Sequence, residues 1–448
     1  MKTKLANHRS VNVVTLGCSK NLIDSEFMMR QLKAAGFEIH HDSNKEAEVI
    51  IINTCGFIND AKEESINTIL HWSELRKEGK IGQLYVMGCL SERYREELKI
   101  EIPEVDGIYG VNDLNQILQD MNAPFRQELL SERIITTPSH YAYLKTSEGC
   151  DHRCSFCAIP AIRGKNISKP IETLIKEAEF LAKSGVKELI LIAQDLTAYG
   201  TDIYGQKALP QLINLLSEVT GIEWIRLHYA YPLGFPVELL EIIRDNPKVC
   251  KYIDIPLQHI NDRILKSMKR GLNGAKTREL VEKIRTTVPG IAIRTSLIVG
   301  YPDETTEEFN ELYKFVEDIR FERLGVFSYS HEENTDAYNL SDNVRPAVKA
   351  RRTEKIMTLQ QTISEQFNAS LTGKELKVLL DKKVGDDWIG RTEYDSPEVD
   401  NEVIITVKDS VNNISITEPG KFVKVKITGY DTYDIYGEII EDWNEKAL

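Results

Sequence analysis

The sequence Glu148-Gly149-Cys150-Asp151-His152-Arg153-Cys154-Ser155-Phe156-Cys157 carries the strongest chemical signal in this chain. Its three cysteines follow an apolar, strand-like run at 141–145 and have the spacing CxxxCxxC. Three thiolates on one short loop can hold three corners of a cubane iron–sulfur cluster, whereas a complete four-iron cluster normally takes four cysteines. One iron then stays open, and an open coordination position marks a reactive metal rather than a structural one.

A zinc site on the same loop is the main alternative. Zinc sites usually combine CxxC pairs into a set of four ligands. No fourth Cys or His follows this loop at a suitable spacing, although His152 lies inside it. We therefore favour an iron–sulfur cluster and expect His152 to be a solvated loop residue rather than a ligand.

The composition is that of an ordinary globular protein. With 448 residues, of which 42% are hydrophobic and 28% charged, the chain has room for two to four domains. No apolar run reaches the roughly 18 residues that span a bilayer, so no membrane association is expected. Residues 1–10 lack the apolar core of a signal peptide. Seven cysteines in so long a chain indicate reduced thiols in the cytoplasm rather than a disulfide scaffold.

The chain is acidic, with 56 Lys and Arg against 69 Asp and Glu and a net charge of −13. Non-specific binding of nucleic acid requires a basic face, so this class of function is not expected. One local basic stretch, at 266–270, has the sequence Lys-Ser-Met-Lys-Arg. We expect it to be a solvated helix face.

The first third of the chain alternates apolar runs with helical patterns. Runs at 11–16, 49–53 and 84–87 are each followed by a helical segment, which predicts a parallel sheet with right-handed crossovers.

A cysteine stands directly after each of these runs. Because parallel strands end at one edge of a sheet, Cys18, Cys55 and Cys89 should converge there. Their convergence suggests a second cluster with one iron open, and three buried structural cysteines are the alternative. Cys250 has no partner motif, and we assign it to packing.

These motifs resemble two known families. The spacing at 150–157 is similar to the signature of the radical S-adenosylmethionine (SAM) superfamily, in which the open iron chelates the amino and carboxylate groups of SAM and an electron from the cluster splits SAM to a 5′-deoxyadenosyl radical. The segments 16–26, 53–58 and 88–90 are similar to the N-terminal domain of methylthiotransferases, where the three cysteines hold an auxiliary four-iron cluster. The resemblance implies two metal-binding triads: catalytic Cys150, Cys154 and Cys157, which hold the radical-generating cluster, and Cys18, Cys55 and Cys89, which hold the sulfur-delivering one.

The middle of the chain predicts an open barrel. Six apolar runs alternate with helical patterns, too few to close an eight-stranded barrel. The superfamily resemblance implies a partial (β/α)6 barrel with the cysteine loop after its first strand. The runs lie at 142–146, 188–193, 224–228, 251–255, 291–297 and 324–328.

Four residues at the ends of these strands are candidates for binding SAM. Gln194 and Asp195 stand where the superfamily contacts the SAM amino group, with a turn or a helix N-cap as the alternative. Arg294 could pair with the SAM carboxylate or form a structural ion pair. Gly300 would let the backbone approach the adenine, or could serve only a turn.

The last part of the chain predicts a small antiparallel barrel after a linker helix at 349–370. It resembles a TRAM domain, which grips RNA in related tRNA-modifying enzymes. Residues 371–448 hold 10 Lys or Arg and 17 Asp or Glu, a net charge of −7, so direct RNA binding is not expected and a basic protein is the better partner. The strands are expected at 376–380, 388–392, 402–406, 422–428 and 436–440, and the aromatic residues expected in the core are Trp388, Tyr394, Tyr430, Tyr433, Tyr436 and Trp443.

The whole chain resembles the RimO-type branch of the methylthiotransferase family. The segment 17–21 has Ser19 and Lys20 where the tRNA-modifying branch tends to have Gln and Met, and the segments 193–195 and 398–400 also match the RimO type. The expected fold is α/β, with a Rossmann-like parallel domain at 9–125, a radical SAM core at 136–367 and a TRAM-like domain at 370–441.

This resemblance implies a reaction and its partners. The enzyme would insert a methylthio group at the β-carbon of an aspartate of small-subunit ribosomal protein twelve, with two 4Fe–4S clusters and two SAM per product. An electron donor such as flavodoxin or ferredoxin would supply electrons. Two alternatives remain: a tRNA adenosine methylthiotransferase of the same family, and, more distantly, a non-catalytic iron–sulfur scaffold or electron carrier.

Overall fold

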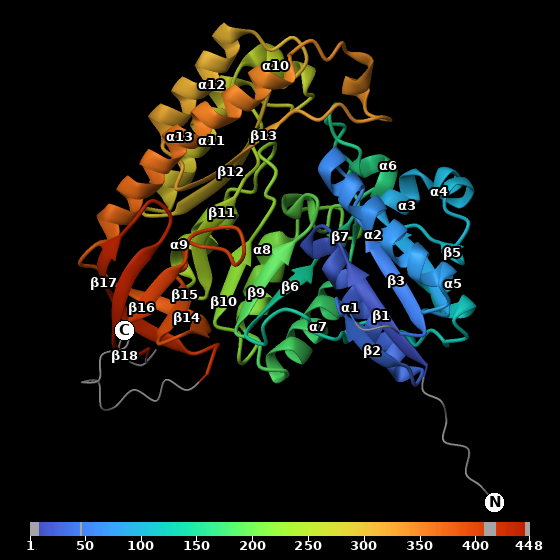
Figure 1. Ribbon diagram of the computed structural model, residues 1–448. Coiled ribbons are helices and arrows are strands. Elements are labelled where there is room, and N and C mark those ends of the chain that lie inside the picture. Colours follow the sequence, from blue (N-terminus) through green and yellow to red (C-terminus); the bar gives the residue numbers. More distant parts are fainter. Residues whose placement is uncertain (1–8, 45–46, 407–417, 444–448) are drawn as a thin grey trace, which may run out of the picture.

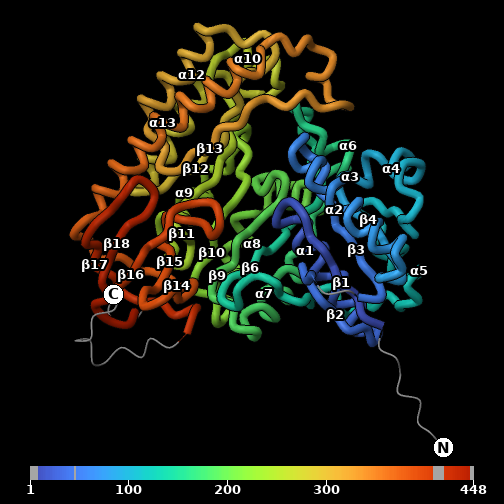
Figure 2. The backbone as a smooth tube through the Cα atoms, viewed as in Figure 1, coloured from blue at the N-terminus to red at the C-terminus, as the bar shows by residue number. Residues whose placement is uncertain are grey.

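The computed structural model describes residues 9–44, 47–406 and 418–443, which form three large β-structures (Figure 1) and a small sheet of β7 (Ser147–Glu148) and β8 (Ile167–Ser168). An N-terminal sheet and a C-terminal barrel lie on opposite sides of a central sheet. The trace in Figure 2 passes from the N-terminal sheet through the central sheet to the barrel. No helix in the described part of the chain is long and apolar enough to cross a membrane. The expected α/β class is confirmed.

The N-terminal sheet is wholly parallel, with the order β2-β1-β3-β4-β5. Every residue of β3 is buried, as expected for a strand covered by helices on both faces. The short edge strands β2 and β5 were not predicted from the sequence. The strands are β1 (Ser10–Thr15), β2 (Glu38–His41), β3 (Val49–Thr54), β4 (Gln83–Gly88) and β5 (Gly107–Ile108); the helices are α1 (Ser19–Ala34), α2 (Asn59–Lys77), α3 (Cys89–Arg93), α4 (Arg95–Glu101) and α5 (Leu114–Asp120).

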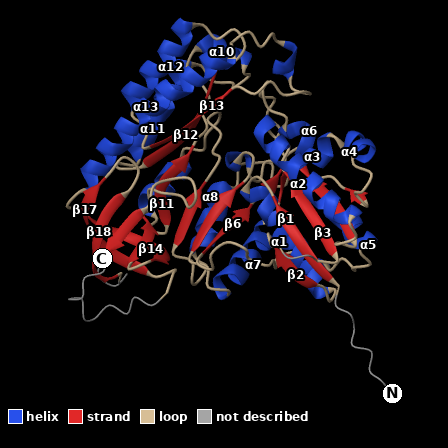
Figure 3. Ribbon diagram, viewed as in Figure 1, coloured by secondary structure: helices blue, strands red, loops and turns tan. Residues whose placement is uncertain are grey.

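The central sheet has six parallel strands in the order β13-β12-β11-β10-β9-β6. The outer strands do not pair with each other, so the sheet is an open, partial barrel as predicted, with its helices on the outer face (Figure 3). The strands are β6 (Tyr141–Lys145), β9 (Glu188–Ile192), β10 (Trp224–Leu227), β11 (Val249–Asp254), β12 (Ala292–Val299) and β13 (Arg323–Ser328); the helices are α7 (Ile171–Lys183), α8 (Leu209–Ser217), α9 (Glu238–Asp245), α10 (Asp262–Ser267), α11 (Gly274–Thr287) and α12 (Thr306–Ile319).

Helix α13 (Pro346–Leu371) leads from the central sheet to the C-terminal barrel. The barrel closes in the order β14-β15-β16-β18-β17, and its β16–β18 pair is parallel, which departs from the predicted antiparallel barrel. Five strands in a closed ring cannot all alternate in direction, so at least one neighbouring pair must be parallel. The strands are β14 (Glu375–Val384), β15 (Asp387–Arg391), β16 (Val403–Thr406), β17 (Phe422–Tyr430) and β18 (Ile435–Asp442).

The aromatic side chains of this barrel divide between its core and its surface. Trp388 belongs to the core, but Tyr430, Tyr433 and Tyr436 are exposed, so the sequence-based expectation was wrong for these three. Their hydroxyls explain part of the difference, since Tyr433 accepts a hydrogen bond from Gln361 and Tyr436 donates one to Asp431 in the loop before β18.

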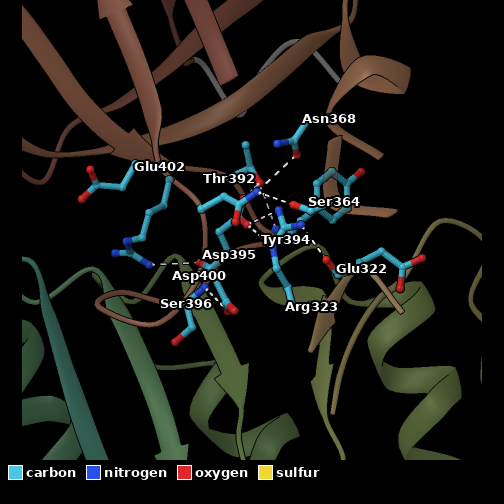
Figure 4. A network of polar contacts seen from close by, with 12 residues as sticks. Glu322, Arg323, Ser364, Asn368, Thr392, Tyr394, Asp395, Ser396, Asp400 and Glu402 are labelled. Carbon is cyan, nitrogen blue, oxygen red and sulfur yellow. Dashed lines mark hydrogen bonds and ion pairs between the residues drawn. The ribbon is translucent and has the colours of Figure 1, made fainter. Parts of the chain in front are cut away.

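Buried ion pairs join the C-terminal barrel to the central sheet. Arg391 of β15 contacts Glu188 of β9 at 2.8 Å, and Glu188 also accepts from Arg226 of β10 at 2.7 Å. Arg323 of β13 pairs with Asp395, which lies in the loop after β15 (Figure 4). Breaking such buried pairs is costly, so this interface fixes the barrel against the sheet.

Apolar packing completes the same interface. Cys250 is fully buried there, in one cluster with Trp224 and Tyr252 of the central sheet and Leu379 and Phe422 of the barrel. Its assignment to packing is confirmed.

Candidate functional site

Three thiols lie at the carboxyl ends of neighbouring strands of the N-terminal sheet, and we call them the strand-end thiols. Cys18 is the N-cap of α1 after β1, Cys55 directly follows β3, and Cys89 is the first residue of α3 after β4. Because β1, β3 and β4 are parallel neighbours, the sheet brings these residues to one edge. Gly17, at φ +91°, approaches so closely that an added Cβ would lie 2.6 Å from the Cβ of Cys55.

The strand-end thiols are close enough to affect one another electrostatically. The pKa of Cys89 is raised to about 12, mainly by burial and in smaller part by the neighbouring Cys18 and Cys55 thiols. Burial also raises the pKa of Cys55, with a smaller contribution from Cys18. Three thiolates so placed repel each other without a cation, and the deprotonated form is the one that binds metal. Cys18 is exposed while the other two are buried, so the site opens on the Cys18 side.

The three cysteines of the CxxxCxxC loop, which we call the loop thiols, lie between β7 (Ser147–Glu148) and α6 (Ile159–Arg163). The Cys150 amide donates to Gly164 O at 3.0 Å, and the Cys157 amide donates to Cys154 O at 3.0 Å. The pKa of Cys150 is raised to about 11 and that of Cys157 to about 12, mainly by desolvation; the Cys154 thiol contributes to both increases and the Cys150 thiol to that of Cys157. The loop therefore gathers the three sulfurs as the spacing predicts.

Two polar groups lie against the sulfur of Cys154, and of these the Arg270 guanidinium is the donor, since the Tyr231 hydroxyl donates to Arg270 O at 3.1 Å. Arg270 Nη1 lies 3.2 Å from Cys154 Sγ, and Tyr231 Oη lies 3.5 Å from it. Arg270 is buried, with its guanidinium 4.3 Å from the Tyr231 ring centroid. The expectation of a solvated face at 266–270 is thus wrong for Arg270, because the chain folds back toward the loop thiols after α10; it holds for the exposed Lys266 and Lys269.

His152 is not the solvated residue that the sequence suggests. Its ring stacks on Tyr231 with centroids 3.6 Å apart, and its Nε2 lies 2.7 Å from Asp195 Oδ2. Asp195 also accepts from the Thr197 amide at 2.8 Å, which makes it the N-cap of a short 3-10 turn, η2 (Leu196–Ala198). Asp195 therefore orients the loop through His152.

The other predicted SAM contacts lie in different surroundings. Gln194 donates to Glu148 at 3.0 Å, and its buried Oε1 has no hydrogen-bond partner among the described residues. Arg294 forms an ion pair with Asp400 of the C-terminal domain at 3.2 Å, the structural alternative left open by the sequence. Gly300 has φ +71°, its amide donates to Glu304, and an added Cβ would collide with Lys349, so this close approach is to α13.

One arginine connects the two sets of thiols, and sequence reasoning missed it. Arg163, at the end of α6, donates to Asn21 at 2.5 Å and pairs with Asp24 at 3.2 Å, both on α1 just after Cys18. It also pairs with Glu148 at 2.8 Å, and its positive charge lowers the pKa of Cys89 against the effect of burial. The signal in the sequence was only its position, on the first helix after the loop.

Apolar contacts join the same elements. Cys89, Ala158 and Ile162 form one buried cluster, so α3 and α6, which adjoin the two sets of thiols, pack directly together. Within the described residues, no three His, Cys, Asp or Glu side chains are arranged to hold a single metal ion. A cubane cluster makes a different demand, because each thiolate binds its own iron.

Comparisons with known proteins agree with this division of the chain. Residues 10–110 match the model of the uncharacterized protein family UPF0004, residues 144–316 match the radical SAM superfamily, and residues 372–440 match the TRAM domain.

Solved structures share the fold at low identity. The radical SAM methyltransferase TsrM from Kitasatospora setae aligns with a TM-score of 0.51 and 14% identity, covering 72% of each chain. The cobalamin-dependent SAM radical enzyme OxsB also aligns with a TM-score of 0.51 and 14% identity, covering 79% of this chain and 56% of its own.

Curated relatives are far more similar in sequence. The ribosomal protein uS12 methylthiotransferase RimO of Flavobacterium psychrophilum is 54% identical over 98% of this chain and 100% of its own length. The protein of the same name from Phocaeicola vulgatus is 52% identical over 96% of this chain and 99% of its own. Similarity of this extent, together with two sets of three cysteines joined by α6, shows that the chain belongs to the RimO family of radical SAM methylthiotransferases.

Proposed function

We propose that this protein inserts a methylthio group at the β-carbon of an aspartate of ribosomal protein uS12, the protein after which its RimO relatives are named. The observation that carries the proposal is the junction of the two sets of thiols through α6 and Arg163. A single set would serve an electron carrier; two adjoining sets fit a reaction that needs a radical and a sulfur donor in one place.

The residues fit the cofactors of the family, two 4Fe–4S clusters and SAM. The loop thiols would hold one cluster and the strand-end thiols the other, each with one iron free of protein ligands. Gln194 is the proposed direct contact to SAM, because its buried Oε1 lacks a partner within the described residues and can accept from an amino group. Asp195, Arg294 and Gly300 have other partners, so we assign Asp195 to positioning of His152 and the other two to the surrounding structure.

The chemistry cannot rest on the side chains alone. Side-chain bases have pKa values of roughly 4 to 10, too low to remove a proton from an aliphatic carbon. When bound, the clusters and SAM supply the electron, the hydrogen abstraction, the sulfur and the methyl group. The chain holds and orients them: Arg270 donates toward Cys154, Tyr231 lies beside the same sulfur, His152 stacks on Tyr231, and Arg163 holds the two sites together.

The partners follow from charge and chemistry. Residues 371–448, with 10 basic and 17 acidic side chains, favour a basic protein over RNA. We propose a cytoplasmic enzyme that takes electrons from a flavodoxin or ferredoxin. The proposed domain limits are 9–125, 136–367 and 370–441.

Anaerobic reconstitution with iron and sulfide, followed by incubation with SAM, a reductant and uS12, tests the function. We expect about eight irons per chain and one methylthio group on uS12 by mass spectrometry. A serine at any of the six thiols should abolish the product, while Cys250→Ser should retain it. A product on tRNA adenosine would place the chain in the sister branch, and absence of 5′-deoxyadenosine would leave a scaffold or carrier.

A further inference from the structure

Lys20 reaches from the N-terminal domain into the central sheet. It stands in the first turn of α1, two residues after Cys18, and is 8% exposed. Its Nζ lies 3.2 Å from the ring centroid of Tyr229, which follows the carboxyl end of β10. The ammonium is therefore buried between the strand-end thiols and the mouth of the partial barrel.

Lys20 has no anionic partner in the described part of the chain, unlike the cations around it. Lys145 pairs with Asp24 and Glu148, and Arg294 pairs with Asp400. Arg226 pairs with Glu188, so each of these other buried cations has a carboxylate partner.

Two titratable groups that Lys20 affects electrostatically, His228 and Asp254, form no ion pair with it in the described residues. Burial lowers the pKa of His228 well below its usual value, and Arg294, Arg226 and Lys20 lower it further, so this ring is neutral at pH 7. Burial raises the pKa of Asp254, and Lys20 is close enough to lower it, but the two form no ion pair. Asp254 lies 3.7 Å from Arg294 and accepts from the Tyr229 amide at 3.1 Å, so its charge is already shared.

An unpaired buried ammonium is costly, and its attraction to an aromatic face offsets only part of that cost. Tyr229 is itself held at φ +61°, an uncommon conformation for a bulky residue. Such strain persists where the surroundings enforce it, often at binding sites. Together these features describe a cation prepared for an incoming anion.

We propose that Lys20 binds the side-chain carboxylate of the substrate aspartate and thereby selects aspartate over asparagine. The inference rests on the proposed function and adds the residue that recognises its target group. The position suits this role, because Lys20 stands two residues after Cys18, the exposed member of the strand-end thiols, so a carboxylate bound to Lys20 would enter on that side of the site. The carbon next to that carboxylate is then held near the site proposed to deliver sulfur.

Lys20→Met tests the proposal, since methionine keeps the length of the chain and removes its charge. The substrates are uS12 and its Asp→Asn variant at the modified position, identified first with wild-type enzyme. We expect the wild-type enzyme to prefer aspartate by about tenfold to a hundredfold in kcat/KM, as charge-assisted hydrogen bonds allow. In Lys20→Met this ratio should fall toward one through a higher KM for uS12, while iron content, cluster spectra and SAM binding stay at wild-type levels.

Lys377→Met is the matched control. Its Nζ lies 4.2 Å from the Phe422 ring in the C-terminal barrel, so the variant removes an ammonium from an aromatic contact elsewhere. It should keep the wild-type preference. If Lys20→Met fails to fold or to bind iron, Lys20→Gln decides the question, and the same loss of preference is expected.

An unchanged aspartate preference in an iron-replete Lys20 variant would overturn the proposal. So would weaker SAM binding with the preference intact, which would assign the ammonium to the SAM carboxylate. Failure of the wild-type enzyme to modify uS12 would instead refute the proposed function, and the inference with it, before any variant is made.

Discussion

Replacing Arg163 by methionine should loosen the N-terminal domain from the central sheet. The substitution removes a guanidinium that contacts Glu148 at 2.8 Å, Asp24 at 3.2 Å and Asn21 at 2.5 Å, with 2% of its side chain exposed. Breaking a buried ion pair costs about 3–5 kcal/mol. Lys145 still pairs with both carboxylates, so we take the lower end, about 3 kcal/mol.

A loss of about 3 kcal/mol raises the population of the opened domain by about a hundredfold. Hydrogen exchange of the α1 amides in the metal-free protein measures this opening, because local separation exposes them without global unfolding. The exchange rates should rise by about that factor in Arg163→Met, with no comparable change in the strands of the C-terminal barrel.

Arg76→Met provides the control. Arg76 forms a partly exposed pair with Asp106 at 3.1 Å, and such pairs contribute only about 0–1 kcal/mol. Equal exchange rates of the α1 amides in Arg163→Met and the wild-type protein would refute the inference that Arg163 holds the N-terminal domain against the central sheet.

Three further predictions follow from single residues. Gly17→Ala should lower the iron content by about four irons per chain, because the new Cβ collides with Cys55. Gly36→Ala, at a similar φ of +93° but with nothing within 4 Å of the new Cβ, should retain the full iron content, and equal iron contents in the two variants would contradict this prediction. Arg270→Gln should lower the reduction potential of the cluster on the loop thiols by about 60 mV, the shift that corresponds to a tenfold preference of the Arg270 hydrogen bond for the reduced cluster. A redox titration with EPR detection measures this potential. An unchanged potential would show that Arg270 does not stabilise the reduced cluster. Burial raises the pKa of Cys250 from 9.0 to about 12, so above about pH 9 this thiol loses its proton in the unfolded chain but keeps it in the folded protein. The free energy of unfolding should therefore fall by about 1.4 kcal/mol per pH unit above that pH. Urea unfolding at pH 8 and 10 should show a smaller loss for Cys250→Ala than for the wild-type protein, and equal losses would argue against the shift.

The sequence predicted the parts of the site that depend on strand direction. An apolar run followed by a cysteine, repeated three times, was enough to place Cys18, Cys55 and Cys89 at one edge of a parallel sheet. The same logic located the six strands of the partial barrel. Hydrophobic periodicity and the alternation of strand and helix patterns are local properties, so they are readable without the tertiary structure.

Contacts between distant segments were not predictable in this way. Arg270 belongs to a stretch that reads as a charged helix face, yet it reaches Cys154, 116 positions earlier in the chain. Lys20 and Arg163 likewise act across the boundary between domains. Their partners are set by how the sheets pack together, which no local pattern specifies.

The pairing of β16 with β18 shows the same limit in the backbone. Each strand was located closely, but their relative direction depends on closure of the ring as a whole. A count of five strands already excludes an entirely antiparallel ring, so this detail was open to a topological argument.

The buried ion pairs between the central sheet and the C-terminal barrel limit how easily that barrel can be replaced by one from another protein. Arg226 donates to Glu393 O, and Arg323 reaches Asp395, so residues just after β15 complete the charge balance of the strands above them. A barrel grafted from another protein without those acceptors would leave buried guanidinium groups uncompensated. Chimeras should therefore keep residues 391–401 of this chain within the grafted barrel, because those residues supply the partners of the buried arginines in the central sheet.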